Sequence, residues 1–217
     1  MNEQKKMILS KIENRVKERL KEEKTGHDWF HIERVTTTAK QIAYQEKADI
    51  FIVQLAALVH DLIDEKVVKD EEAAKKELEK WFSELDVSQN DRQHVMEIIQ
   101  TISFKGGNGP RLSSLEAKVV QDADRLDAIG AIGIARCFTY AGSKGHVIDD
   151  PTVPVRNQMT LTEYRNAPST AINHFYEKLL KLKEQMNTQA GREEAERRHL
   201  FMEQFLQEFY RETRSTD

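Results

Sequence analysis

Two histidines and two aspartates occur in the first part of the chain in an order that could hold a metal ion. His31 stands alone. His60 is followed directly by Asp61, and Asp124 comes much later. Imidazole nitrogens and carboxylate oxygens together form a mixed ligand set that suits a borderline divalent cation. Four such ligands leave coordination positions for water and a phosphate oxygen, as a catalytic metal requires.

The surroundings of the His60–Asp61 pair favour this interpretation. A His-Asp dipeptide is common by chance, and a single histidine on a helix is more often an ordinary surface or core residue. Here the pair directly follows an almost wholly apolar run, residues 50–59, and precedes Leu62 and Ile63. Charged groups buried in such surroundings are costly unless they are paired or bound to a metal. A structural salt bridge is the alternative that these residues leave open.

Three short strings carry a resemblance to a known family. They are His27-Asp28-Trp29-Phe30-His31-Ile32-Glu33-Arg34-Val35, His60-Asp61-Leu62-Ile63-Asp64-Glu65 and Ala123-Asp124-Arg125-Leu126. In this order, over roughly residues 25 to 130, the chain resembles the HD superfamily of metal-dependent phosphohydrolases. Its signature is an isolated His, a His-Asp pair after an apolar helix, and a distal Asp. Residues 103–107 and 121–136 are also similar to one bacterial subfamily, the nucleoside triphosphate pyrophosphohydrolases.

The resemblance implies a ligand set and a cofactor. The implied metal ligands are His31, His60, Asp61 and Asp124. Asp122 competes for the distal position, but side chains two residues apart on a helix point about 200° away from each other. The alanine and arginine beside Asp124 match the family better, so we expect Asp124 to be the ligand. The implied cofactor is one divalent cation, Mn²⁺ in the first place, with Ni²⁺, Co²⁺, Fe²⁺, Zn²⁺ or Mg²⁺ as alternatives.

Two acidic residues after the His-Asp pair are candidates for activating water. Asp64 comes four residues after His60, and Glu65 four residues after Asp61, so on a helix each would share a face with one ligand. Stringent-response hydrolases of the same superfamily have a Glu-Asp pair here that assists hydrolysis. The order of the two types is reversed in this chain, which leaves the individual roles open. A solvated helix end is the alternative interpretation.

Basic side chains are candidates for contacting the phosphates of a substrate. His27 precedes His31 by one helical turn and could contact a phosphate or hold a ligand in place. Lys105, beside paired glycines, could offer its ammonium group together with backbone N–H groups. The irregular segment from about 141 to 168 could fold over a triphosphate as a lid. Its cationic candidates are Lys144, His146, Arg156 and Arg165. Ordinary solvated surface is the alternative for all of them.

Helical periodicity along almost the whole chain must position these residues. A first helix is predicted from the stripe Met7, Ile8, Ile12, Val16 and Leu20. A second, after Gly26, carries Phe30, Val35, Ile42 and Tyr44 as its apolar side chains. The apolar run from 50 through 63 predicts a helix that is buried on nearly all sides.

Capping residues and glycines mark the later helices. Residues 71–82 predict a helix, and Ser88 is the expected N-cap of the next one, through Ile102. Ser113 with Glu116 predicts a capping box that opens a helix running through 129. Gly130 and Gly133 within that helix indicate close approach of a neighbouring helix. The last two helices are expected at 169–186 and 191–212.

Length and composition are typical of a single helical domain. The 217 residues are enough for one core, and 39% of them are hydrophobic and 32% charged, which is ordinary for a helical protein. Helical periodicity predicts an all-α fold, and the resemblance implies an HD-domain bundle over residues 1–217. Its motif-bearing core spans about 25–130, its irregular insertion about 141–168, and its C-terminal helices about 169–213. The 33 basic and 37 acidic residues form no basic block, so we expect no duplex nucleic acid as a partner.

The compartment follows from what the sequence lacks. The single Cys137 excludes an internal disulfide and fits a reducing environment. The first twenty residues hold no uninterrupted apolar stretch, so neither a signal peptide nor a membrane span is expected there. These features predict a cytoplasmic protein that does not associate with a membrane.

The resemblance implies the reaction. A metal-activated water would attack a nucleoside or deoxynucleoside triphosphate and give the monophosphate and pyrophosphate. One alternative is hydrolysis of nucleoside monophosphates or cyclic nucleotides on the same metal. The other is a regulatory module that binds a nucleotide at a catalytically idle site. The expected partner is a small-molecule nucleotide, and a homo-oligomer is left open.

Overall fold

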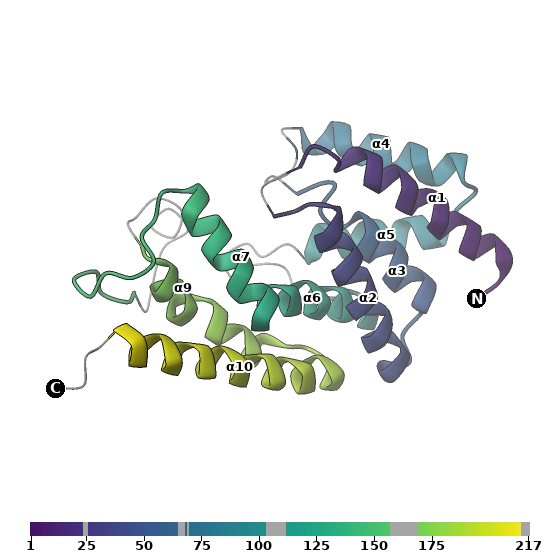
Figure 1. The fold of residues 1–217 in the computed structure, drawn as a ribbon. Helices are drawn as coiled ribbons and strands as arrows, with labels where there is room; N and C mark the ends of the chain where they lie inside the picture. Colours follow the sequence, from purple (N-terminus) through teal and green to yellow (C-terminus); the bar gives the residue numbers. More distant parts are fainter. Residues whose placement is uncertain (24–25, 65–67, 69, 103–111, 157–168, 214–217) are drawn as a thin grey trace. The chain divides into compact units, whose positions relative to one another are not determined.

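The computed structural model describes residues 1–23, 26–64, 68, 70–102, 112–156 and 169–213 (Figure 1). Within these ranges the chain is helical and contains no strand, which confirms the all-α class. The helices are α1 (Glu3–Arg19), α2 (Trp29–Glu46), α3 (Ile50–Val59), α4 (Glu71–Glu84), α5 (Gln89–Thr101), α6 (Leu115–Asp127), α7 (Gly130–Ser143), α9 (Ala171–Glu177) and α10 (Gln189–Thr213), with the 3₁₀ helix η1 (Leu179–Gln185). No helix of the described ranges is long and apolar enough to cross a membrane.

The chain forms two compact units. The first comprises Met1–Asp124 and the second Arg125–Asp217, so the boundary falls inside α6. The organisation of residues 1–217 as a single domain stays a prediction. The candidate metal ligands all belong to the first unit.

The apolar helix α3 is the centre of the first unit. Its residues are buried except for partial exposure of Ile50 and Gln54, and α1, α2 and α5 pack against it. Asp49 caps its N-terminus by accepting hydrogen bonds from the backbone N–H groups of Phe51 and Ile52. The predicted buried helix is therefore confirmed. It is shorter than expected, because it ends at Val59 and residues 60–63 form a turn.

Two apolar stripes were predicted partly wrongly. In α2, Phe30 and Tyr44 are 64% and 78% exposed. The buried face of α2 consists of His31, Ile32, Val35, Ala39, Ile42 and Ala43. In α1, Met7 is exposed and Leu9 is buried instead. The face of α2 that enters the core is therefore the one that carries His31.

The helix starts of α5 and α6 depend on serine caps. Ser88 accepts a hydrogen bond from the N–H of Asp91 at 3.2 Å, as predicted. At α6 the cap is Ser114, whose hydroxyl accepts from the N–H of Ala117, so the predicted capping box with Ser113 is wrong. Glu116 lacks its predicted capping role because its carboxylate accepts from the N–H of Asp49 at 3.0 Å, at the start of α3.

The predicted helix through residue 129 breaks after Asp127 in the second unit. Gly130 begins α7 with φ +74°, a left-handed conformation that L side chains rarely adopt. A Cβ at Gly133 would lie 2.3 Å from the carbonyl oxygen of Ala128. Both glycines do allow close approach, but at Gly133 the neighbour is the chain just before α7 and not another helix.

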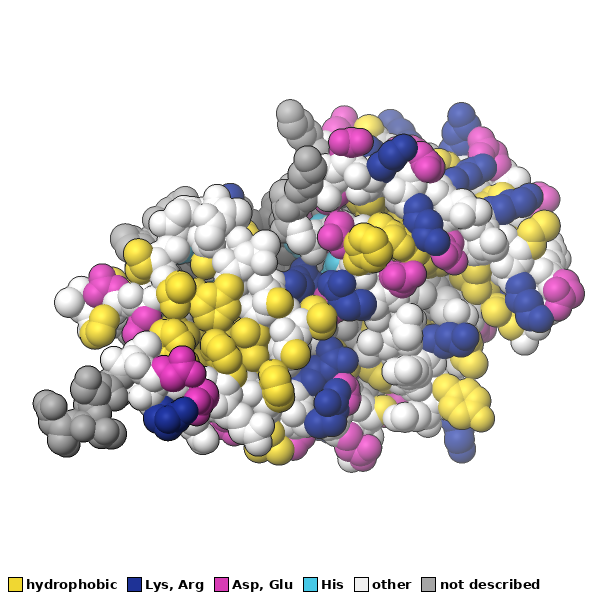
Figure 2. All heavy atoms as spheres, in the orientation of Figure 1, with side chains coloured by type: hydrophobic (Ala, Val, Ile, Leu, Met, Phe, Trp, Pro, Cys, Tyr) yellow, Lys and Arg dark blue, Asp and Glu magenta, His cyan; other side chains and the backbone are white. Residues whose placement is uncertain are grey.

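The C-terminal part of the second unit differs in detail from the prediction. The helix expected at 169–186 is divided into α9 and the 3₁₀ helix η1. Residues 144–156 are non-helical, as expected for the irregular segment, whose first residues still belong to α7. Figure 2 shows hydrophobic side chains on the surface of this unit. Its exposed large apolar residues are Ile132, Tyr140, Val147, Ile148, Val155, Leu200 and Phe201.

Candidate metal centre

His60 stands at the C-terminal end of α3 with its two ring nitrogens in different surroundings. Its Nδ1 lies 2.8 Å from the carbonyl oxygen of Ala57, one turn back in α3. A carbonyl oxygen can only accept, so Nδ1 carries a proton and donates it there. Nε2 is buried and has no hydrogen-bond partner among the described residues. It lies 3.4 Å from Asp61 Oδ1 and 3.8 Å from Asp124 Oδ1.

His31 reaches the same place from the first turn of α2. The N-cap Asp28 accepts a hydrogen bond from the N–H of His31 at 2.9 Å, which fixes the start of the helix. His31 Nε2 is 3.3 Å from Asp61 Oδ2 and 3.5 Å from Asp124 Oδ1. The rings of His31 and His60 meet edge to face, with centroids 5.3 Å apart. Two buried imidazoles from separate helices therefore converge on two carboxylates.

The charges at this place are strongly coupled. Burial alone lowers the pKa of His60, but the charge of Asp61 and the contact with Asp124 raise it to about 9. Burial raises the pKa of Asp61, yet the charge of His60 and hydrogen bonds from His27 and His31 hold it well below its usual range. Burial likewise opposes ionisation of Asp124, and contact with His60 lowers its pKa to about 2. The carboxylates thus stay ionised and form a site that attracts positive charge.

The donor atoms fall into two overlapping groups that could hold a metal ion. Nitrogen and oxygen atoms of His31, His60 and Asp124 lie within 4.8 Å of one another, and so do those of His27, His31 and Asp61. All four predicted ligands are therefore brought together around His31, although no single group contains all of them. The unpartnered Nε2 of His60 and the two ionised carboxylates fit a divalent cation.

His27 also lies at this site, and its contact partner there could not be predicted from the sequence. Its Nδ1 is 2.8 Å from Asp61 Oδ2, so the structure places it against a predicted ligand. The signal that the sequence offered was Asp28, because an aspartate three residues before His31 has the spacing of an N-cap. That spacing starts α2 at Trp29 and leaves His27 just outside the helix.

The predicted water-activating pair is described only in part. Asp64 is half-buried and follows the turn after His60, with its N–H donating to the carbonyl oxygen of Asp61 at 3.1 Å. The helical spacing assumed for Asp64 is therefore replaced by a turn, because α3 has already ended. Glu65 lies outside the described residues. The roles of both residues stay predictions.

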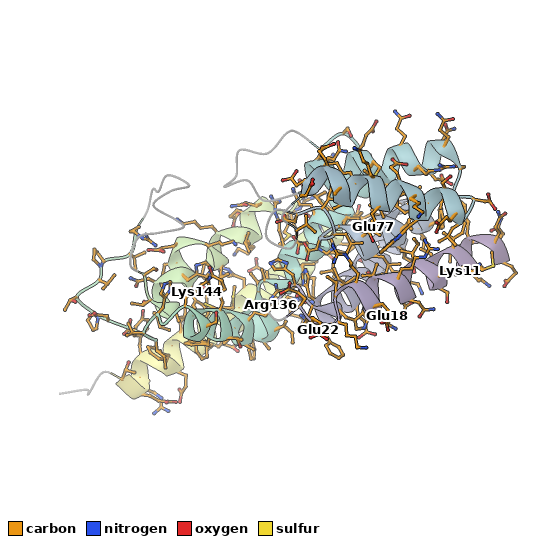
Figure 3. All side chains as sticks on the ribbon, turned by 90° about the horizontal axis from the view of Figure 1, so that it is seen from above. Lys11, Glu18, Glu22, Glu77, Arg136 and Lys144 are labelled. Carbon is orange, nitrogen blue, oxygen red and sulfur yellow. The ribbon has the colours of Figure 1, made fainter. Side chains whose placement is uncertain are left out.

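The other predicted substrate contacts belong to the second unit or lie outside the described residues. Lys144, labelled in Figure 3, is exposed at the C-cap of α7, with its ammonium 5.6 Å from the ring centroid of Tyr140. Arg156 donates through Nε and Nη2 to the two carboxylate oxygens of Glu177, each at 2.8 Å, so its guanidinium already has a buried partner. His146 is exposed. Lys105 and Arg165 lie outside the described residues.

Comparisons with known proteins bear on the family of the chain. The HD-domain family model matches residues 29–129, a range that contains all four predicted ligands. A crystal structure of an HD-superfamily hydrolase from Bacillus thuringiensis is 43% identical, with a TM-score of 0.79 over 98% of this chain and 100% of that one. This chain belongs to the HD superfamily. A predicted HD-superfamily hydrolase from an uncultured Thermotogales bacterium is 27% identical, with a TM-score of 0.63 over 94% and 92% of the chains.

A further relative is similar to this chain over almost its whole length. YpgQ of Bacillus subtilis is 42% identical over 200 residues, which are 91% of this chain and 90% of YpgQ. A crystal structure of YpgQ in complex with ADP aligns with a TM-score of 0.78 over 96% of each chain. The family establishes the hydrolase class for this chain, and the groups around His31 supply the side chains that could hold a divalent cation.

Proposed function

We propose that this HD-superfamily hydrolase converts nucleoside or deoxynucleoside triphosphates into the monophosphate and pyrophosphate. Its cofactor is one divalent cation, Mn²⁺ in the first place, held by His31, His60, Asp61 and Asp124. The observation that carries the proposal is the position of His60 Nε2 beside two carboxylates. Because Nδ1 donates to Ala57, Nε2 is the nitrogen that faces Asp61 and Asp124, and this arrangement is stabilised by a proton on Nε2 or by a divalent cation that replaces the proton.

Two further points support a nucleotide as the substrate. YpgQ has been crystallised with ADP, and this chain is similar to it over almost its whole length. The segments 103–107 and 121–136 are similar to nucleoside triphosphate pyrophosphohydrolases, which favours cleavage between the α- and β-phosphates. Attack at the α-phosphorus releases pyrophosphate as one unit and leaves one phosphate on the nucleoside.

The chain's own residues contribute in three ways. A bound divalent cation supplies Lewis acidity, lowering the pKa of water and polarising a phosphoryl oxygen. Asp64 or Glu65 orients the attacking water and takes its proton. The basic side chains of His27, Lys105, Lys144, Arg156 and Arg165 are the candidates for binding the phosphates. The guanidinium of Arg156 already donates to the carboxylate of Glu177, which makes it the weakest candidate among those that the structure describes.

A nucleotide panel assayed with Mn²⁺ in ¹⁸O-labelled water tests the reaction. We expect the label in the nucleoside monophosphate and none in pyrophosphate, because the oxygen enters the phosphorus that is attacked. Label in free inorganic phosphate would move the function to a phosphatase, and hydrolysis of cyclic nucleotides alone to a phosphodiesterase. Binding without turnover of any nucleotide would indicate the idle regulatory module.

The water-activating carboxylate is tested by two substitutions that keep shape and remove basicity. Asp64→Asn or Glu65→Gln, whichever removes the true base, should lower kcat by about 10²-fold or more. Mn²⁺ affinity should be unchanged in both variants, since neither residue is a proposed ligand. Steady-state kinetics and Mn²⁺ binding measured on the same preparations separate the two effects. Full activity in both variants would contradict a role for this pair.

A further inference from the structure

His27 makes a direct contact with a proposed metal ligand. Its Nδ1 lies 2.8 Å from Asp61 Oδ2, a normal hydrogen-bond distance. The ionised carboxylate of Asp61 can only accept, so His27 donates through Nδ1–H. The His27 ring also meets the ring of His31 edge to face, with centroids 5.7 Å apart and an interplanar angle of 83°. Two contacts therefore hold this imidazole in one orientation.

The local backbone brings His27 to this position. Gly26 has φ +95°, a left-handed conformation that turns the chain just before His27. Asp28 then caps α2, so His27 lies immediately before the helix and is not constrained by its geometry. Its side chain is 20% exposed, whereas those of His31 and His60 are 1% and 3% exposed. His27 therefore covers the outer side of Asp61, and it lies outside the range matched by the family model.

Asp61 needs such a partner because its own element does not fix it. It follows the end of α3, in the turn formed by residues 60–63, and it presents two different oxygens. Oδ2 is held by His27 and lies 3.3 Å from His31 Nε2, while Oδ1 lies 3.4 Å from His60 Nε2. Rotation about the Cβ–Cγ bond would move both oxygens away from these positions. The hydrogen bond from His27 restrains this rotation, so that the oxygen not held by His27 stays directed toward His60.

We propose that His27 is a positioning residue of the metal centre, which orients the carboxylate of Asp61 by donating its Nδ1–H to Oδ2. This inference rests on the proposed metal centre. Of the two roles that the sequence left open for His27, it selects holding a ligand in place over contact with a phosphate. Partners that hold a metal-binding carboxylate through a hydrogen bond typically contribute about 10- to 100-fold to metal affinity. The effect of His27 should therefore appear in cation binding before any nucleotide is added.

Three substitutions of His27 test which of its two ring nitrogens supports metal binding. An asparagine places its amide nitrogen near the position of Nδ1, because both atoms are one bond from Cγ. A glutamine places its amide nitrogen near Nε2 instead, and an alanine provides neither. We expect His27→Asn to bind Mn²⁺ nearly as well as the wild type, whereas His27→Gln and His27→Ala weaken binding by about 10- to 100-fold. His94→Ala is the matched control: His94 of α5 is half-buried beside Glu116 and belongs to neither group of candidate ligands, so the substitution should leave the affinity unchanged.

Mn²⁺ is titrated into the full chain without nucleotide, and the concentration of free Mn²⁺ is measured by electron paramagnetic resonance. Thermal unfolding of each variant shows whether it is folded. Equal loss of affinity in all three variants would overturn the inference and make His27 itself a ligand. Unchanged affinity with a raised KM for the nucleotide would overturn it in favour of a phosphate contact. The expected binding pattern in a protein that hydrolyses no nucleotide would support the inference and contradict only the proposed reaction.

Discussion

The two ring nitrogens of His60 have different roles, because one bonds to the backbone of α3 and the other faces the candidate metal site. Nδ1 donates to the carbonyl oxygen of Ala57, which satisfies one of the backbone acceptors left open at the end of α3. The same hydrogen bond determines that Nε2 is the nitrogen that faces Asp61 and Asp124. When a divalent cation replaces the proton on Nε2, this backbone contact holds His60 in the tautomer that a metal ligand requires.

Asp124 and Asp122 provide the sharpest test of the ligand assignment at this scale. Asp124 Oδ1 lies 3.5 Å from His31 Nε2, whereas Asp122 is fully buried and belongs to neither candidate group. Asp124→Asn should lose Mn²⁺, because a neutral amide is a much weaker ligand than a carboxylate. Asp122→Asn keeps the buried shape and should retain about one Mn²⁺ per chain. Metal analysis of both desalted proteins measures this, and the reverse result would move the distal ligand to Asp122.

At the scale of elements, the junction between α6 and α7 depends on two glycines. Gly130 adopts φ +74°, and a Cβ there would lie 3.0 Å from the side chain of Arg198 in α10. Arg198 donates through Nη1 to the carbonyl oxygen of Leu126 at 2.6 Å, which satisfies a backbone acceptor near the end of α6. Arg136 of α7 forms a salt bridge with Asp127. The break between the two helices is therefore stabilised by side chains from α7 and α10.

Gly133 and Gly142 form a matched pair for testing this junction, because both are helical residues of α7. A Cβ at Gly133 would lie 2.3 Å from Ala128 O, while a Cβ at Gly142 would meet nothing within 4 Å. Gly133→Ala should lower the free energy of unfolding by about 1–3 kcal/mol, since backbone must move to accommodate the methyl group. Gly142→Ala should be neutral or stabilising by up to about 1 kcal/mol. Urea unfolding of the two variants decides; equal stabilities would contradict the close approach at Gly133.

For the whole molecule, a half-buried histidine links stability to pH. Burial lowers the pKa of His174 in α9, and nearby positive charge adds to the effect, so that the pKa is about 4 instead of 6.5. Among the described residues, the charges of Lys178, Arg156 and His146 add to this shift, and the charge of Glu177 opposes it. The folded chain therefore keeps His174 neutral at pH values where the unfolded chain protonates it.

This difference predicts a specific loss of stability in acid. Above about pH 7, His174 is neutral in both states and contributes nothing. As the pH falls from 6.5 toward 4, only the unfolded chain takes up the proton, so up to about 3 kcal/mol of unfolding free energy is lost. In His174→Gln this part of the pH dependence should be absent. Urea unfolding of both proteins at pH 7.5 and pH 5 measures it; a difference between them that does not change with pH would contradict the assignment to His174.

The sequence determined the elements and the types of side chain at the site. The apolar run from 50 to 59, the aspartate at 49 and the serine at 88 are local signals, because capping and burial of a whole helix depend on neighbouring residues. The types and order of the motifs identified four candidate metal ligands, namely His31, His60, Asp61 and Asp124. The resemblance to the HD superfamily followed from the same residues, and the family comparison confirmed it.

The tertiary structure decided which face of each helix enters the core and how the site is assembled. Phe30 and Tyr44 are apolar but exposed, because α2 turns His31 and Ala39 toward the core, and periodicity cannot rank two neighbouring stripes. The contact of His27 with Asp61 joins residues that are 34 positions apart. No local pattern predicts such a distance, because it depends on how α2 packs against α3. The types of the site residues could therefore be predicted from the sequence. Their contact partners could not, because these depend on how the helices that carry the residues pack together.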